Sequence, residues 1–277
     1  MPFRPRRCLA RRLAPVSLLQ AFNLVKTYNG RAVVDGVSFH VDPSEIVGLL
    51  GRNGAGKTTS FRMVIGMIAM DRGSVSLDEH DISTLPMYQR ARLGMGYLSQ
   101  EPSIFQRLTV EQNLLAILQT RPMKRADRRR RCTELLEQFG LTHKTREMAR
   151  TCSGGERRKL EIARALVTEP RLILLDEPFS GVDPLAVEDL QKEIVRLTDM
   201  GIAILVTDHN VQQTLRVSDR AYIINEGKVL REGTPKALIN DEMVRRSYLG
   251  SLFRGDEFDD HPRARRRRPH GEGGQAA

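Results

Sequence analysis

A glycine-rich segment in the first quarter of the chain limits the possible folds more than any other feature. Its sequence is Gly51-Arg52-Asn53-Gly54-Ala55-Gly56-Lys57-Thr58-Thr59, and it follows an apolar run from Ile46 to Leu50. A helix is expected directly after it, running to Ala69. A strand, a tight glycine turn and a helix form a phosphate-binding loop, because the glycines free backbone N–H groups and the helix N-terminus adds positive potential. The segment therefore predicts a site for a nucleoside triphosphate.

Three residues of this phosphate loop have expected roles. Lys57 reaches the β- and γ-phosphates, Thr58 binds Mg²⁺, and Thr59 extends the loop toward the α-phosphate. Kinases, GTPases, helicases and transport ATPases all carry such a loop. The rest of the chain must distinguish among these classes.

Length and cysteine content limit the number of domains and the compartment of the protein. The chain has 277 residues, enough for one large or two small domains. Its three cysteines, Cys8, Cys132 and Cys152, have neither the number nor the spacing of a disulfide framework or a zinc site, which indicates a reducing compartment. No apolar stretch approaches the roughly 20 residues that cross a bilayer.

Half of the net charge of +10 lies in residues 1–17, whereas the acids of the C-terminal tail nearly balance its arginines. Residues 1–17 contain five arginines and no acid, and the tail contains Arg265 to Arg268. Residues 1–17 lack the apolar core of a secretory signal, so we expect both 1–17 and 251–277 to be disordered extensions. The body has an ordinary charge, no Trp and few aromatic residues, so no nucleic-acid partner is expected.

Two β-rich segments precede the phosphate loop. Residues from Leu18 to Thr27 and from Ala32 to Val41 predict antiparallel strands joined at Asn29-Gly30. Tyr28 sits at this turn. Its ring either stacks on adenine, since a base presents a flat π-face, or packs on its own hairpin.

Three later apolar runs predict buried strands of the main sheet, each followed by polar residues suited to the phosphate site. Asp176 is expected to hold Mg²⁺ through water and Glu177 to orient or deprotonate the attacking water, since neighbours on a strand point to opposite sides. Gln100 either touches Mg²⁺ or its water, or lies in solvent. His209 either reaches the γ-phosphate or is structural. The runs are Met95 to Leu98, Leu172 to Asp176 and Ile202 to Val206.

The region from about 101 to 167 has a helical pattern and predicts an inserted subdomain. Thr109 and Gln112 have capping-box spacing for a helix to Gln119, and a second helix is expected from Lys124 to Phe139. The segment Ser153-Gly154-Gly155-Glu156 begins a third helix. Its start is either a second anion-binding site or simply a well-capped end.

The expected fold class is α/β. The phosphate loop, the β-rich start and the helical region resemble those of a P-loop NTPase, which implies a RecA-like mixed sheet, an antiparallel β subdomain and the inserted α-helical subdomain. In the last third of this domain, Asp183 caps a helix that begins with Pro184, and a hairpin turns at Glu226-Gly227. The expected domain spans residues 18–250.

From about Leu18 to Gly250 the sequence resembles the ATP-binding cassette of ABC transporters. Six ordered motifs carry the resemblance. They are Walker A at Gly51 to Thr59, the Q-loop at Gln100, the signature at Ser153 to Glu156, Walker B at Leu172 to Asp176 with catalytic Glu177, the D-loop around Asp183, and the switch His209.

The resemblance implies a mechanism. Tyr28 matches the aromatic residue that stacks on adenine, and Ser153 to Gly155 of one subunit closes on ATP held by another. The implied assembly is a homodimer that binds ATP and Mg²⁺ and joins separate membrane subunits, with Lys57, Gln100, Glu177 and His209 acting in hydrolysis.

Within the family, Tyr97 to Phe105, Asp176 to Pro184 and Thr207 to Val211 look like the ATP-binding subunits of lipopolysaccharide export. Two membrane subunits are then expected to dock near Arg92, Phe105 and Leu108, on the cytoplasmic face of the inner membrane. The transported molecule would not touch the cassette. The ATPases of branched-chain amino acid importers look similar, and a soluble, non-transport cassette protein is a further alternative.

One position departs from the family pattern. Cys152 stands where the family usually has Leu before Ser-Gly-Gly. Since Cys is also small and apolar, ATPase activity is expected to survive.

Overall fold

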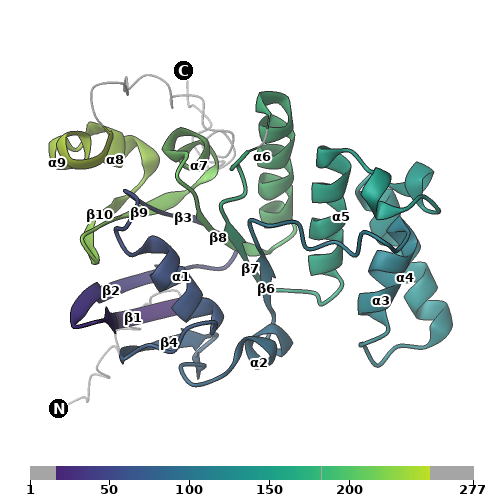
Figure 1. Cartoon of the computed structure of the whole chain (residues 1–277), viewed down its shortest axis with the longest axis horizontal. Coiled ribbons are helices and arrows are strands. Elements are labelled where there is room, and N and C mark those ends of the chain that lie inside the picture. Colours follow the sequence, from purple (N-terminus) through teal and green to yellow (C-terminus); the bar gives the residue numbers. More distant parts are fainter. Residues whose placement is uncertain (1–16, 182, 250–277) are drawn as a thin grey trace, which may run out of the picture.

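The computed structural model describes residues 17–181 and 183–249 (Figure 1). The arginine-rich segments at 1–16 and 251–277 lie outside the described residues, so the expectation of disorder there stays a prediction. Within the described ranges, no helix combines the length and apolar character of a membrane span.

A six-stranded mixed sheet forms the centre of the fold, with strand order β10-β9-β3-β8-β7-β6. Five strands are parallel to their neighbours, and β10 is antiparallel on the edge. Every residue of β3, β7 and β8 is buried, as expected of parallel strands covered on both faces. The strands are β3 Ile46–Gly51, β6 Met95–Leu98, β7 Leu172–Asp176, β8 Ala203–Thr207, β9 Arg220–Asn225 and β10 Lys228–Gly233.

The two faces of this sheet belong to different hydrophobic cores. Leu172 and Leu174 of β7 pack in the core shared with helix α1 (Lys57–Ile65) and the N-terminal strands. Ile173 and Leu175 of the same strand pack in the core shared with the helical insert. Because side chains alternate along a strand, β7 joins the two halves of the molecule.

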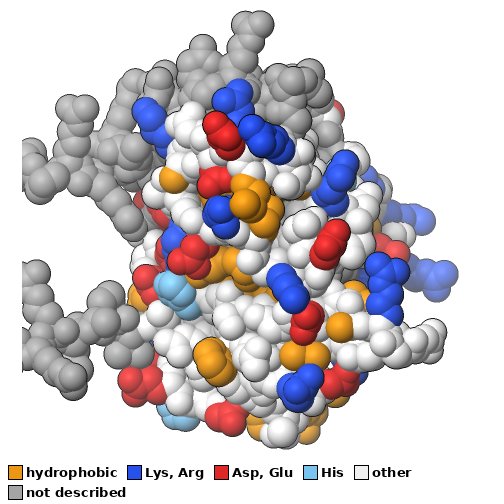
Figure 2. Space-filling model, turned by 90° about the vertical axis from the view of Figure 1, so that its left-hand side faces the viewer, with side chains coloured by type: hydrophobic (Ala, Val, Ile, Leu, Met, Phe, Trp, Pro, Cys, Tyr) orange, Lys and Arg blue, Asp and Glu red, His pale blue; other side chains and the backbone are white. Residues whose placement is uncertain are grey.

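A second, antiparallel sheet has the order β2-β1-β4-β5. The predicted turn at Asn29-Gly30 is present, with φ of 49° and 75°, as a tight hairpin requires. On the side of the molecule drawn in Figure 2, Lys and Arg side chains lie interspersed with Asp and Glu. The strands are β1 Leu19–Tyr28, β2 Arg31–Val41, β4 Arg72–Leu77 and β5 His80–Asp81.

Helix α1 (Lys57–Ile65) ends earlier than the sequence predicts. Its expected end at Ala69 is wrong because Gly66 adopts φ 85°, and its N–H bonds back to the carbonyls of Arg62 and Met63. The side chain of Arg90, from helix α2 (Met87–Arg92), binds the carbonyls of Met63 and Val64 at this end. A cation at a helix C-terminus complements the helix dipole.

The predicted helical insert is present at the right of Figure 1. It contains α3 (Val110–Leu118), α4 (Arg125–Gln138) and α5 (Gly154–Leu166). Both predicted capping boxes form with reciprocal hydrogen bonds. Two short 3₁₀ turns, Thr142–Lys144 and Ala149–Thr151, connect α4 to α5.

The remaining helices follow β7. Leu50, Leu215, Ile223 and Leu238 belong to a third core cluster, which packs α7 and α8 against β3 and β9. The helices are α6 Pro184–Asp199, α7 Val211–Val217, α8 Pro235–Asn240 and α9 Glu242–Val244, with a π-helical turn at Arg245–Leu249. These elements confirm the expected α/β fold.

Candidate active site

The phosphate loop connects β3 to α1 and depends on its glycines. A Cβ on Gly51 would lie 2.2 Å from the carbonyl oxygen of Ile224, and one on Gly56 would lie 2.6 Å from that of Val33. Gly56 also adopts φ 102° at the start of α1. A side chain at either position would force the loop apart, so close backbone packing fixes its shape.

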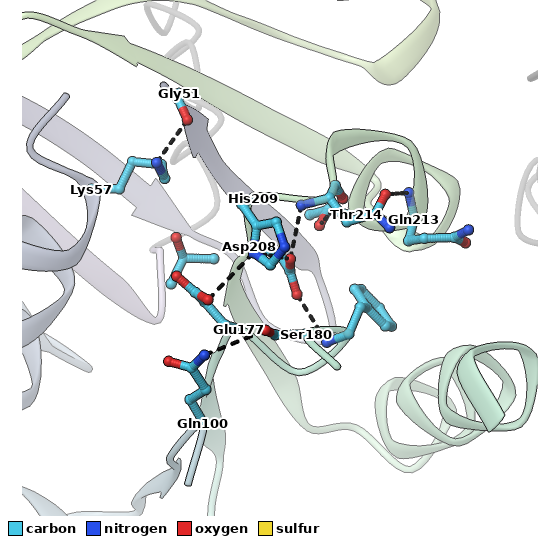
Figure 3. Close-up of polar contacts among 12 residues, drawn as sticks. Gly51, Lys57, Gln100, Glu177, Ser180, Asp208, His209, Gln213 and Thr214 are labelled. Atoms are coloured by element: carbon cyan, nitrogen blue, oxygen red, sulfur yellow. Dashed lines mark hydrogen bonds and ion pairs between the residues drawn. The ribbon is translucent and has the colours of Figure 1, made fainter. Parts of the chain in front are cut away.

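Lys57 lies inside this loop. Its Nζ donates to the carbonyls of Gly51 at 2.7 Å and Arg52 at 3.0 Å (Figure 3). Only 7% of the residue is exposed. Burial lowers the pKa of the ammonium, while the negative charges of Glu177 and Asp208 oppose this shift. The loop therefore holds a buried cation where phosphate oxygens are expected.

The two carboxylates after β7 have different surroundings. Asp176 is the last strand residue and is buried, and Tyr97 donates its hydroxyl to Asp176 Oδ2 at 3.4 Å. Burial raises the pKa of the Asp176 carboxyl. Glu177 follows the strand with φ 45°, and its side chain points toward His209. Such a conformation costs free energy in a non-glycine residue and is common at functional sites.

His209 follows β8 and lies between two carboxylates. Its Nδ1 is 3.3 Å from Glu177 Oε2 and 3.3 Å from Asp208 Oδ1 (Figure 3). Asp208 is fully buried, and its oxygens accept hydrogen bonds from the backbone N–H groups of Phe179 and Asn210, both at 2.8 Å. Burial raises the pKa of Asp208, and these two hydrogen bonds oppose the shift. Asp208 thus joins the turn after β7 to the turn after β8.

Sequence reasoning missed Asp208 as a site residue. The available signal was its position, immediately before His209 at the end of a buried strand. Gln100 was predicted as a site residue; it is exposed, and its contact with Mg²⁺ stays a prediction. It follows β6, and its Nε2 donates to Ser180 Oγ at 3.3 Å, beside the Glu177 turn.

The signature segment lies at the N-terminus of α5, where Ser153 Oγ accepts from the N–H of Glu156 and Glu156 Oε2 accepts from the N–H of Ser153. A cavity of about 460 Å³ lies in front of it, lined among others by Gln100, Glu177 and Asp183. Asp183 also caps α6, accepting from the N–H of Ala186 at 3.0 Å. None of the phosphate-loop residues 51–59, all of which the structure describes, lines this cavity.

Tyr28 and the expected docking residues lie at the surface. Tyr28 is 44% exposed, with Lys26 Nζ 5.5 Å from its ring centroid. Phe105 is 43% exposed, Arg92 is exposed beside the ring of Tyr88, and Leu108 is half-buried. Their positions are compatible with the expected contacts, which remain predictions.

Cys152 is buried beside the signature segment. Its exposed fraction is 4%, and burial is the main cause that raises the pKa of its thiol. A neutral, small side chain thus fills the position before Ser153.

Comparisons with known proteins identify the family of the chain. The family model described as ABC transporter matches residues 34–180. The chain is 52% identical over 240 residues to the lipopolysaccharide export system ATP-binding protein LptB of Haemophilus influenzae and to that of Escherichia coli, covering 86% of this chain and 100% of each relative.

A solved structure gives the same result for the fold. An ATP-binding cassette of an ABC transporter in its ADP conformation superposes with a TM-score of 0.76 at 28% identity, over 85% of this chain and 99% of that one. The chain therefore belongs to the ATP-binding cassette proteins of the ABC transporter family.

Proposed function

We propose that this chain is the ATP-hydrolysing subunit that powers lipopolysaccharide export from the inner membrane. The observation that carries the proposal is the 52% identity to LptB proteins over their whole length. Similarity to these relatives does not favour the alternative that the chain is the ATPase of a branched-chain amino acid importer. The local chemistry supports ATP hydrolysis, because a phosphate loop and a carboxylate–histidine pair lie at one edge of the main sheet.

ATP binds first at the phosphate loop. Backbone N–H groups between Gly51 and Gly56, with Lys57, Thr58 and Thr59, receive the phosphates, and Tyr28 stacks on the adenine. The hairpin that carries Tyr28 reaches this loop, as the tight packing of Gly56 against Val33 demonstrates. Binding the phosphates compensates the buried charge of Lys57.

The residues present fit a magnesium ion. Asp176 is a buried carboxylate, and burial raises its pKa, so a nearby cation would stabilise its charged form. Thr58 and Gln100 would add a hydroxyl and an amide oxygen, which with the Asp176 carboxylate would make an all-oxygen donor set of the kind Mg²⁺ prefers. When bound, Mg²⁺ would neutralise charge on the phosphates.

Glu177 and His209 act on the reacting groups. Glu177 Oε2 accepts a proton from, or orients, the attacking water, and His209 positions Glu177 and approaches the γ-phosphate. Asp208 holds the His209 ring through its contact with Nδ1. Lys57 stabilises negative charge that develops on the phosphoryl oxygens.

Two copies of the chain complete each ATP site. The signature segment and Asp183 line a cavity apart from the phosphate loop of their own chain. In a head-to-tail homodimer, the N–H groups at Ser153, Gly154 and Gly155 of one copy would face the phosphates held by the other, with Glu156 maintaining the cap. Hydrolysis then separates the copies.

Two membrane subunits complete the transporter. They dock at the surface around Arg92, Phe105 and Leu108, which places the chain peripherally on the cytoplasmic face of the membrane. Lipopolysaccharide passes through the membrane subunits without touching this chain.

The test is to tag the chain, extract it gently from membranes of its native host and identify the copurifying polypeptides. Two membrane subunits with large extracytoplasmic β-rich domains are expected. Recovery of polytopic permeases together with an amino-acid-binding protein would overturn lipopolysaccharide export and leave the ATP-site assignments intact.

A further inference from the structure

The π-helical turn at Arg245–Leu249 carries Tyr248, a half-buried aromatic residue that the ATP site described above does not include. Its ring packs against the third core cluster, to which Leu50 and Ile223 belong. Leu50 directly precedes Gly51, the first residue of the phosphate loop. This turn of the chain therefore shares a core cluster with the residue that leads into the nucleotide site.

The Tyr248 hydroxyl lies near the ends of two neighbouring strands. Burial raises its pKa to about 12; the N–H of Gly51, at the end of β3, opposes this shift, and the charge of Asp208, directly after β8, adds to it. The oxygen is buried, but it makes no hydrogen bond of normal geometry with any residue that the structure describes. Because most buried hydroxyls in proteins have a partner, an unpaired one beside a nucleotide site points to a functional role.

Gly51 connects this hydroxyl to the lysine of the phosphate loop. Its N–H acts on the Tyr248 oxygen, and its carbonyl accepts from Lys57 Nζ at 2.7 Å (Figure 3). Gly51 has little room to shift toward β9, since its backbone packs closely against the carbonyl oxygen of Ile224. A group that fixes the Gly51 amide therefore also fixes the place from which Lys57 meets the phosphates.

We propose that Tyr248 is a positioning residue of the phosphate loop, whose hydroxyl accepts a full hydrogen bond from the N–H of Gly51 when phosphates occupy the loop. Since this bond is poor without the phosphates and better with them, the hydroxyl favours the nucleotide-bound loop by the difference. The core cluster holds the ring in place in both cases. The inference rests on the proposed phosphate-binding role of residues 51–59, and not on the dimer or the transported substrate.

Tyr248→Phe removes the hydroxyl and keeps the ring. We expect the affinity of the full chain for Mg-ADP, measured by titration calorimetry, to fall about fivefold. KM for ATP should rise by a similar factor, while kcat changes less than about twofold. Without nucleotide, the melting temperature should stay equal or rise, because the variant no longer buries an unpaired hydroxyl. A simple loss of packing would lower both the affinity and the melting temperature.

Tyr222→Phe is the matched control, because the Tyr222 hydroxyl is buried and paired. Tyr222 is 1% exposed, and its hydroxyl lies 3.0 Å from His40 Nδ1 and accepts from Arg220. Losing these contacts should lower the melting temperature and leave the affinity for Mg-ADP unchanged. This pattern is the reverse of the one expected for Tyr248→Phe. Lys57→Ala tests the phosphate loop itself and should weaken Mg-ADP binding at least about tenfold.

The outcomes separate the role of Tyr248 from that of the loop. Normal Mg-ADP affinity in Tyr248→Phe would overturn the inference, as would an equal loss of affinity in Tyr222→Phe. A melting temperature that falls in Tyr248→Phe as far as in Tyr222→Phe would also overturn it, since the hydroxyl would then be paired without nucleotide. Normal Mg-ADP binding by Lys57→Ala would contradict the proposed phosphate site, and the role of Tyr248 would fall with it.

Discussion

Glu177 and His209 face each other across the ends of two adjacent strands, with His209 Nδ1 3.3 Å from Glu177 Oε2. This contact joins the turn after β7, where Glu177 adopts a left-handed conformation, to the turn after β8. A substitution of either residue is therefore expected to lower the rate of ATP hydrolysis more than the affinity for ATP.

Replacing Glu177 by Gln removes the group that accepts a proton while preserving its shape. We expect kcat for ATP hydrolysis to fall at least about a hundredfold, with ATP affinity retained, since the proton acceptor acts in the chemical step. The variant should accumulate as an ATP-bound dimer in size-exclusion chromatography. Near-normal turnover would exclude Glu177 as the residue that activates water.

Asp208→Asn tests the buried carboxylate that contacts His209. The amide can still accept one backbone hydrogen bond, but it loses the charge beside Nδ1. We expect kcat to fall about tenfold, because Asp208 orients the His209 ring without contacting the reacting groups itself. Asp127→Asn, at a half-buried acid of α4, is the control and should leave kcat unchanged. Equal effects of the two variants would show that Asp208 has no specific role.

Arg90→Met tests how the end of α1 is held. Arg90 is 2% exposed and donates to the carbonyls of Leu85, Met63, Val64 and Ser83. Losing these buried bonds should lower the free energy of unfolding by about 3 kcal/mol. Chemical denaturation measures the change. Arg92→Met, two residues later and exposed, should change stability by less than about 0.5 kcal/mol; a comparable loss there would contradict the capping role of Arg90.

The thiol of Cys132 provides a pH test. Burial raises its pKa to about 12, and the residue is 1% exposed. At pH 8 the folded chain should therefore be alkylated at Cys132 about a thousandfold more slowly than the unfolded chain, since only the thiolate reacts. Because the unfolded state loses this proton first, the contribution of Cys132 to stability should fall as pH rises above the ordinary thiol pKa toward 12. Peptide mass spectrometry after timed alkylation measures the rate, and rapid labelling at pH 8 without unfolding would contradict the burial.

Phe105→Ala tests the docking surface. Removing an exposed aromatic side chain should weaken copurification of the membrane subunits at least about tenfold, because aromatic anchors dominate interface energies. ATP binding should remain, which a nucleotide-binding assay measures. Phe22→Ala is the matched control, since Phe22 is 67% exposed on β1. Unchanged copurification with Phe105→Ala would refute the assignment.

Much of the fold follows from local patterns that the sequence displays. The buried runs of β3, β7 and β8, the Asn29-Gly30 turn and the Ser153 capping box depend on residues adjacent in the chain. Each was predicted because its physical cause is local.

The remaining features depend on contacts between distant residues. The end of α1 was predicted too late because Met67, Ile68 and Ala69 continue an apolar pattern, whereas Gly66 and the distant Arg90 decide it. Asp208 has no motif of its own, and its partners Phe179 and Asn210 come together only in the folded chain. Likewise, no spacing relates Arg164 to Phe105, although the guanidinium carbon of Arg164 lies 4.5 Å from the centroid of the Phe105 ring.

The alternation along β7 makes this strand sensitive to changes of length rather than of composition. Swapping one aliphatic residue for another there alters packing locally. Inserting or deleting a single residue would instead exchange the two sets of side chains between the two cores and shift Asp176 away from the loop edge. Related cassettes should therefore vary freely in which aliphatic residues fill this strand, but not in how many residues separate its start from its terminal acid.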